Sequence, residues 1–119
     1  MSQRTERIQK LAKQVLGEAI HDLKDPRVGF VTITAVRVTP DLRHARVFVS
    51  VLGSTEEQTL TMDGLASAKA HLRAELGRQM RLKYLPELGF ELDTGPEEAQ
   101  RLEGLLRRIH EDEDEDSKP

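Results

Sequence analysis

The sequence predicts a small α+β domain in which three strands form one sheet and the helices pack on one face of it. Two segments carry apolar residues at a helical period, and three shorter segments alternate or are rich in β-branched residues. Their order is helix, strand, strand, interrupted helix, strand, and then a last helix with an acidic tail. The chain has 119 residues, 37% of them hydrophobic, which is enough for one modest core.

The first element is a helix over about residues 3–23. Its apolar residues recur three and four positions apart and predict a buried stripe. The stripe consists of Ile8, Leu11, Ala12, Val15, Leu16, Ala19, Ile20 and Leu23. The helix ends at Asp25-Pro26, because a proline disfavours the α conformation in the residue before it.

Two strands follow, over residues 30–38 and 43–52, with a hairpin turn at 39–42. The second strand alternates cleanly between apolar and polar residues. In the first strand the apolar positions change from odd to even numbers, which predicts a β-bulge near Thr34-Ala35.

The next helix begins at Ser54 or Thr55, since each is followed three residues later by Glu57 or Gln58, the pattern of a capping box. Its helical period continues to about residue 83, which is long for one straight helix in a small domain. Small residues over 64–68 therefore predict a break. The residues expected to face the core are Leu65, Ala68, Leu72, Leu76 and Met80.

A third strand is expected over residues 88–93, and Thr94-Gly95-Pro96 begins a final helix with proline at its first position. The apolar face of that helix is expected to carry Leu102, Leu105, Leu106 and Ile109. Residues 111–119 hold six acids and one lysine and should be disordered. We therefore expect one folded domain over 1–110, with 17 basic and 15 acidic residues, and an acidic tail over 111–119.

The composition argues against several functions. The chain has no cysteine, which excludes disulfides, thiolate zinc sites and a cysteine nucleophile and is typical of a reducing compartment. The longest uncharged run has nine residues, too short to cross a bilayer, and no signal peptide is recognisable, so we expect a cytoplasmic protein. The histidines His21, His44, His71 and His110 lack metal-ligand spacing. Without a phosphate loop or nucleophile elbow, we expect no enzyme and no cofactor or metal.

Basic residues form the pattern that points to a ligand. Arg4, Arg7, Lys10 and Lys13 recur every three residues around the first helix, and no acid lies between Arg7 and Lys13. Such rows neutralise phosphates. The predicted phosphate contacts are Arg7, Lys10, Arg27, Lys69, Arg73, Arg78 and Arg81, with Arg4, Lys13 and Arg46 at the periphery.

Aromatic stacking platforms, which are usual in proteins that bind single strands, are nearly absent. Phe48 on the open sheet face is the candidate, whereas Phe30, Tyr84 and Phe90 are expected in the core. Nucleic acid would then be bound mostly through its backbone and shape.

Five segments in register carry a family resemblance. They are 25–29 (DPRVG), 31–36 (VTITAV), 41–51 (DLRHARVFVSV), 72–82 (LRAELGRQMRL) and 86–93 (PELGFELD). Together they resemble bacterial ribosome-binding factor A over about residues 4–106. The resemblance implies a K-homology-like domain of type II topology, although the family's Ala-x-Gly kink reads Ala68-Lys69-Ala70 here and lacks its glycine.

The resemblance also implies a function. It suggests a non-enzymatic factor in ribosome biogenesis that binds the free or immature 30S subunit near the 5′ and 3′ ends of 16S rRNA. Such a factor assists rRNA processing at the 5′ end, matters most in the cold and leaves before translation. We expect a monomer that binds no membrane.

Two other classes of function remain open. A protein-interaction module with no direct RNA contact would use its apolar helices or the open sheet face, and its charges would serve solubility. A small hydrolase would need a pocket with paired carboxylates.

Overall fold

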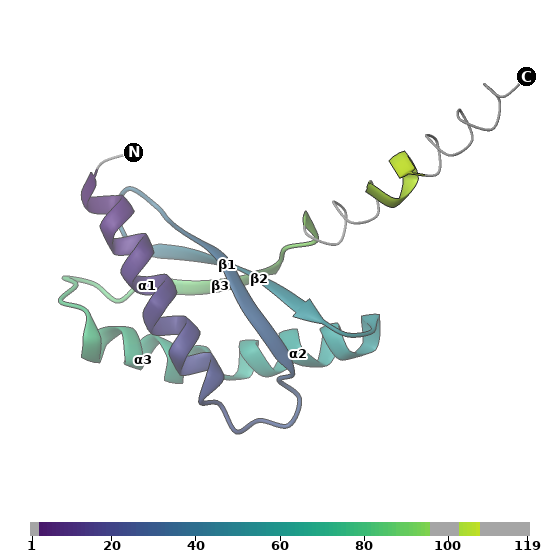
Figure 1. The fold of residues 1–119 in the computed structure, drawn as a ribbon. Helices are drawn as coiled ribbons and strands as arrows, with labels where there is room; N and C mark the ends of the chain where they lie inside the picture. The colour runs from purple at the N-terminus through teal and green to yellow at the C-terminus, as the bar shows by residue number, and fades with distance from the viewer. Residues whose placement is uncertain (1–2, 96–102, 108–119) are drawn as a thin grey trace, which may run out of the picture.

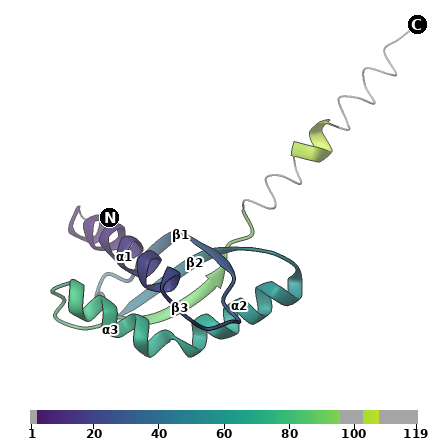
Figure 2. The ribbon, with the colours of Figure 1, turned by 60° about the horizontal axis from the view of Figure 1, so that its bottom comes forward.

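The computed structural model describes residues 3–95 and 103–107 and has the predicted α+β architecture (Figure 1). The elements are α1 (Gln3–His21), β1 (Phe30–Val38), β2 (His44–Leu52), α2 (Thr55–Ser67), α3 (Lys69–Gln79) and β3 (Glu87–Leu92). The sheet order is β1-β2-β3, with β1 antiparallel and β3 parallel to β2. Helix α1 packs against β1 and α3, and Figure 2 shows the interrupted helix α2–α3 running along the sheet.

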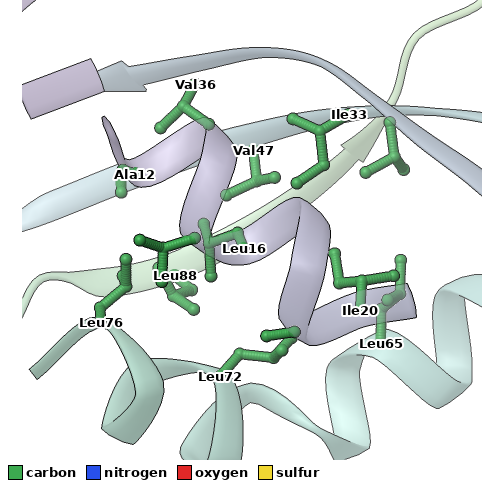
Figure 3. Close-up of a cluster of buried hydrophobic side chains, with 14 of the residues drawn as sticks. Ala12, Leu16, Ile20, Ile33, Val36, Val47, Leu65, Leu72, Leu76 and Leu88 are labelled. Atoms are coloured by element: carbon green, nitrogen blue, oxygen red, sulfur yellow. The ribbon is translucent and has the colours of Figure 1, made fainter. Parts of the chain in front are cut away.

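The core lies between the three helices and one face of the sheet (Figure 3). In β2, the side chains of Ala45, Val47, Val49 and Val51 are buried on that face, while the residues between them point to the open face. Helices α1, α2 and α3 each contribute a leucine with no exposed surface, namely Leu16, Leu65 and Leu72. Burial of one such side chain contributes roughly 1.5–3 kcal/mol. The predicted inward face of the long helix is confirmed.

The predicted bulge is confirmed at Thr34. Ile33 pairs with Val49 and Ala35 pairs with Phe48, so Thr34 is the extra residue in β1. This insertion explains why Ile33 and Val36, three positions apart, both face the core.

The capping box and the predicted break in the long helix are also present. Ser54 accepts a hydrogen bond from the Glu57 N–H, and the Glu57 side chain accepts one from the Ser54 N–H. The break lies at Ala68, which ends α2 and precedes α3 with φ −90° and ψ 1°. A negative φ strains no L-residue, so the break needs no glycine. Ala70 lies after it, exposed in the first turn of α3.

Several predicted boundaries were wrong. Helix α3 ends at Gln79 rather than near Lys83, because Met80 turns extended (φ −121°, ψ 138°) and is buried in the core. Helix α1 ends at His21 rather than 23, β2 begins at 44 rather than 43, and β3 spans 87–92 rather than 88–93. Residues 103–107 are helical; the rest of the predicted last helix and the acidic tail lie outside the described residues.

Three predicted core residues are exposed instead. Phe30 is 81% exposed, because it precedes the bulge on the even-numbered side of β1 and lies opposite Leu52 on the open face. Tyr84 is 48% exposed, because α3 has already ended and the residue lies in the loop before β3. Leu11 is 44% exposed, on a side of α1 that borders a groove. Phe90 packs against the core as predicted.

Candidate nucleic-acid interface

The four basic residues of α1 are all exposed, but they do not form one row. A step of three residues turns a helix by about 300°, so each residue is displaced sideways from the last. Arg4 and Arg7 therefore border one side of α1, and Lys10 and Lys13 border the other. Each pair lines a different groove.

The first groove, here the α1–α3 groove, lies between α1 and the chain that follows α3. Its volume is about 270 Å³, and it is lined by Arg4, Arg7, Ile8, Leu11, Met80, Arg81 and Leu82. Three arginines from two separate elements meet there without an acid among the lining residues. The floor is apolar. Guanidinium groups above such a floor can hold phosphate oxygens while the floor contacts sugars.

The second groove, here the α1–β1 groove, lies between α1 and the edge strand β1. Its lining residues are Glu6, Gln9, Lys10, Lys13, Thr34, Ala35, Val36 and Arg37. The buried Gln9 fixes the two walls, because its Oε1 accepts a 3.0 Å hydrogen bond from the Val38 N–H. Three cations and one acid line this groove.

Arg37 in the second groove was missed by the sequence prediction. Its place on an outward position of β1 could be deduced from the strand phase after the bulge. Its position beside Lys10 and Lys13 could not, since it depends on how α1 packs on the sheet edge.

Four predicted phosphate contacts lie in ion pairs. Arg27 binds the Asp25 carboxylate at 2.7 Å, and Arg46 binds both carboxylate oxygens of Glu91 at 2.7 Å. Arg78 pairs with Glu75, one turn earlier in α3. Arg73 pairs with Glu87 at 3.1 Å and also donates to backbone carbonyls. Contact between these four arginines and phosphate stays a prediction, and it would have to compete with these partners.

The remaining predicted contacts are not paired in this way. Within the described ranges 3–95 and 103–107, no ion pair involves Arg4, Arg7, Lys10, Lys13, Lys69 or Arg81. Lys69 stands apart from the others, because it begins α3, an 11-residue helix that is roughly 16 Å long, and Arg81 follows the opposite end of that helix. The structure thus gathers five of the predicted residues around the N-terminal half of α1, joined by Arg37.

Hydrogen bonds shift the pKa values of three aspartates. The Arg27 side chain lowers the pKa of Asp25 and is itself held charged by it. The Thr34 hydroxyl and the Gly95 N–H lower the pKa of Asp93, and Thr39 with the Arg43 N–H lowers that of Asp41. Such carboxylates remain ionised and bind fixed donors, as expected of structural groups rather than of proton donors in catalysis.

The open sheet face presents one covered aromatic ring. The Arg46 guanidinium lies 5.2 Å from the centroid of the Phe48 ring while it holds Glu91. The predicted stacking platform is therefore occupied on one side by a side chain of the same strand.

No cluster of three or more metal-ligating side chains occurs within the described part of the chain. His21, His44 and His71 are exposed on separate elements, and His110 lies outside the described residues. In the same described part, no helix has both the length and the apolar character needed to cross a membrane.

Comparison with known proteins decides the family. The family model described as "Ribosome-binding factor A" matches residues 4–106 of this chain. The chain belongs to the ribosome-binding factor A family. A ribosome-binding factor A of Dictyoglomus thermophilum is 41% identical over 119 residues, covering 98% of this chain and 99% of the relative.

Solved structures of the ribosome-binding factor A family have the same fold. The crystal structure of ribosome-binding factor A from Thermus thermophilus has a TM-score of 0.67 and 31% identity, covering 74% of this chain and 94% of that one. A homology model of the Thermus thermophilus factor, fitted into a cryo-EM map of its complex with 30S, has a TM-score of 0.61 and 32% identity, covering 71% and 90%. The K-homology-like fold implied by the sequence resemblance is thereby confirmed.

Proposed function

We propose that this chain is an assembly factor that binds the free or immature 30S subunit through 16S rRNA, acting as a monomer and without catalysing a reaction. The α1–α3 groove and the α1–β1 groove hold RNA phosphates on both sides of α1. By occupying the RNA, the protein delays or orders local structure and so assists late maturation, including 5′-end processing. Such help is most needed in the cold, when misfolded RNA rearranges slowly.

The observation that carries this proposal is the meeting of Arg4, Arg7 and Arg81 in one groove. Two elements separated by most of the sequence bring these side chains together, and no acid lines the groove. Unpaired arginines in an acid-free groove attract a polyanion, because no intramolecular partner has to be displaced first. The Thermus thermophilus factor, which has been fitted into a map of a complex with 30S, supports the choice of this polyanion.

We assign binding of the ribosome to residues 1–110. The tail 111–119, with six acids and one lysine, is proposed to compete with RNA for the same cations and so to reduce nonspecific binding. Both assignments are open to deletion experiments.

A second candidate function is favoured by the open sheet face. Phe30 and Leu52 pair across β1 and β2 and are 81% and 76% exposed. An exposed apolar pair of this kind suits contact with a protein. In that case the double variant Phe30→Ser/Leu52→Ser would no longer bind the 30S subunit, whereas variants with reversed groove charges would still bind it.

Sucrose-gradient sedimentation tests the first proposal. The protein should travel with purified 30S subunits and not with 70S ribosomes. Arg7→Glu/Arg81→Glu should remove it from the 30S fraction, whereas Lys24→Glu/Arg107→Glu, an equal change of charge outside both grooves, should not. Equal behaviour of the two double variants would contradict docking through the α1–α3 groove.

A further inference from the structure

Another cationic cluster, whose pocket shares no lining residue with either α1 groove, lies where the loop between α3 and β3 meets the start of β2. A shallow pocket of about 300 Å³ is lined there by Arg43, His44, Arg73, Tyr84, Leu85 and Glu87. We call it the Tyr84 pocket. The Arg43 guanidinium carbon lies 5.1 Å from the centroid of the Tyr84 ring, and Lys83 Nζ lies 5.5 Å from it.

The backbone around this pocket is held in place by Arg73. Its guanidinium donates hydrogen bonds of 3.0 Å to the Pro86 carbonyl and 2.8 Å to the Leu85 carbonyl, and it pairs with Glu87. These contacts attach the loop residues that follow Tyr84 to helix α3. Arg73 is thus a positioning residue for the pocket.

Two further contacts complete the support. Leu85 packs so close to Gly77 of α3 that a Cβ at that glycine would lie 2.9 Å from Leu85 Cδ2. The Glu87 N–H donates a 2.7 Å hydrogen bond to the Arg43 carbonyl, which ties the start of β3 to Arg43. The aromatic ring and the guanidinium are therefore presented by chain segments that are fixed to one another.

Two cations are left for an external anion, namely Arg43 in the pocket and Lys83 beside the Tyr84 ring. Glu87, the carboxylate that lines the pocket, already pairs with Arg73. Asp41 accepts hydrogen bonds from the Thr39 hydroxyl and the Arg43 backbone N–H, which lower its pKa most, and the Arg43 charge lowers that pKa further. Within residues 3–95 and 103–107, no carboxylate forms an ion pair with Arg43 or Lys83.

This combination of groups matches one kind of ligand. A guanidinium lying over a half-exposed ring offers its outer plane to a flat base, and unpaired bases stack on arginine and aromatic side chains. A nearby ammonium can hold the phosphate of the same nucleotide. A duplex keeps its bases stacked inside, and an acidic peptide would make no use of the ring.

We propose that the Tyr84 pocket binds one unpaired RNA nucleotide, with its base stacked on the Arg43–Tyr84 pair and its phosphate on Lys83. The proposal rests on the proposed function in that both ligands are RNA, but it uses different residues. The α1 grooves contact the backbone without regard to base pairing, while this pocket selects a single-stranded position.

Tyrosine fluorescence tests the proposal on the full chain, because Tyr84 is the sole tyrosine and the chain has no tryptophan. We would titrate the protein with an unpaired RNA octamer and with a blunt-ended RNA duplex at the same phosphate concentration, using N-acetyltyrosinamide to correct for absorption. The octamer should change the Tyr84 emission, and the duplex should not. Equal changes with both RNAs would overturn the proposal.

Variants separate stacking from general attraction. Fluorescence anisotropy with a labelled octamer should show weakening of roughly 5-fold or more for Arg43→Gln and Tyr84→Ser. Tyr84→Phe, which keeps the ring, should bind as the wild type does, and so should Lys24→Gln, a lysine outside the pocket. Because Tyr84 is half exposed in a loop, the serine variant should fold, as circular dichroism would verify.

The same measurements distinguish failure of this pocket from failure of the proposed function. If Arg43→Gln binds the octamer as tightly as Lys24→Gln while Arg7→Glu/Arg81→Glu loses 30S, the pocket proposal alone is wrong. If the octamer changes Tyr84 emission but no groove variant affects 30S binding, the groove proposal alone is wrong. An equal emission change with a peptide of sequence 111–119 would show charge attraction without stacking and would also overturn the pocket.

Discussion

The Thr34 hydroxyl donates a 2.7 Å hydrogen bond to Asp93 Oδ2, across 59 positions of sequence. Thr34 is the extra residue of the bulge in β1, and Asp93 directly follows β3 at the other edge of the sheet. The same hydroxyl lies 3.3 Å from the Phe48 carbonyl of the central strand. One bulged residue thereby links all three strands, and the bulge aims its side chain at this contact.

This contact predicts a pH-dependent contribution to stability. Hydrogen bonding lowers the pKa of Asp93 in the folded state. A carboxyl with a lowered folded pKa stabilises the fold fully above its unfolded pKa, about 3.9, and loses that contribution as the pH falls through the folded pKa. Thr34→Val should therefore lose less stability than the wild type between pH 7 and pH 3, as urea unfolding would measure.

The wild type and Thr34→Val share the other shifted carboxyls, Asp25 and Asp41, so the difference between the two proteins reports the Thr34 contact. Parallel pH profiles would mean that the hydroxyl contributes nothing to the lowered pKa of Asp93.

Truncating a side chain in the core between the helices and the sheet should cause the largest loss of unfolding free energy. Leu72→Ala removes a side chain with no exposed surface and should cost about 2–5 kcal/mol of unfolding free energy. Leu60→Ala removes a side chain that is 49% exposed on α2 and should change stability by about 0.5 kcal/mol or less. Similar urea midpoints for the two variants would contradict the assignment of Leu72 to the core.

The break between α2 and α3 predicts the effect of placing at position 70 the glycine that the sequence resemblance implies. Since the break lies at Ala68 with negative φ, Ala70→Gly changes only an exposed helical position. It should lower stability by at most about 1 kcal/mol and leave 30S binding unchanged. Tighter 30S binding by Ala70→Gly in a pelleting assay would show that the alanine limits the geometry of the break.

Removal of the acidic tail should increase nonspecific binding to RNA. Deletion of residues 111–119 removes six acids and one lysine and should raise the affinity for a random-sequence RNA in filter binding. Replacing the six acids by serine and glutamine keeps the length and should act as the deletion does. Unchanged affinity in both would exclude a competing role for the tail.

Local patterns in the sequence were sufficient for the elements of this fold. The change of apolar phase in β1 located the bulge at Thr34, and the capping pair Ser54 and Glu57 located the start of α2. Both signals lie within a few residues of the feature that they predict, so no tertiary information is needed.

The candidate interface could be predicted only in part. The sequence shows the basic residues of α1 as one row. Their division between two grooves depends on how α1 packs against β1 and α3. The Arg46–Glu91 pair joins residues that are 45 positions apart, so it cannot be deduced from spacing in the sequence. The predicted core position of Tyr84 is wrong, because the residue lies in the loop after α3, and tertiary contacts decide how that loop lies on the surface.

The salt dependence of 30S binding tests the central claim most directly. Six cations line the two α1 grooves, namely Arg4, Arg7, Lys10, Lys13, Arg37 and Arg81. If each meets a phosphate, log K should fall with log salt at a slope of roughly −4 to −5, and Arg7→Gln/Arg81→Gln should make the slope shallower by about 1.5. Lys24→Gln/Arg107→Gln should leave it unchanged. A flat wild-type slope, or the same slope in both double variants, would contradict docking through these grooves.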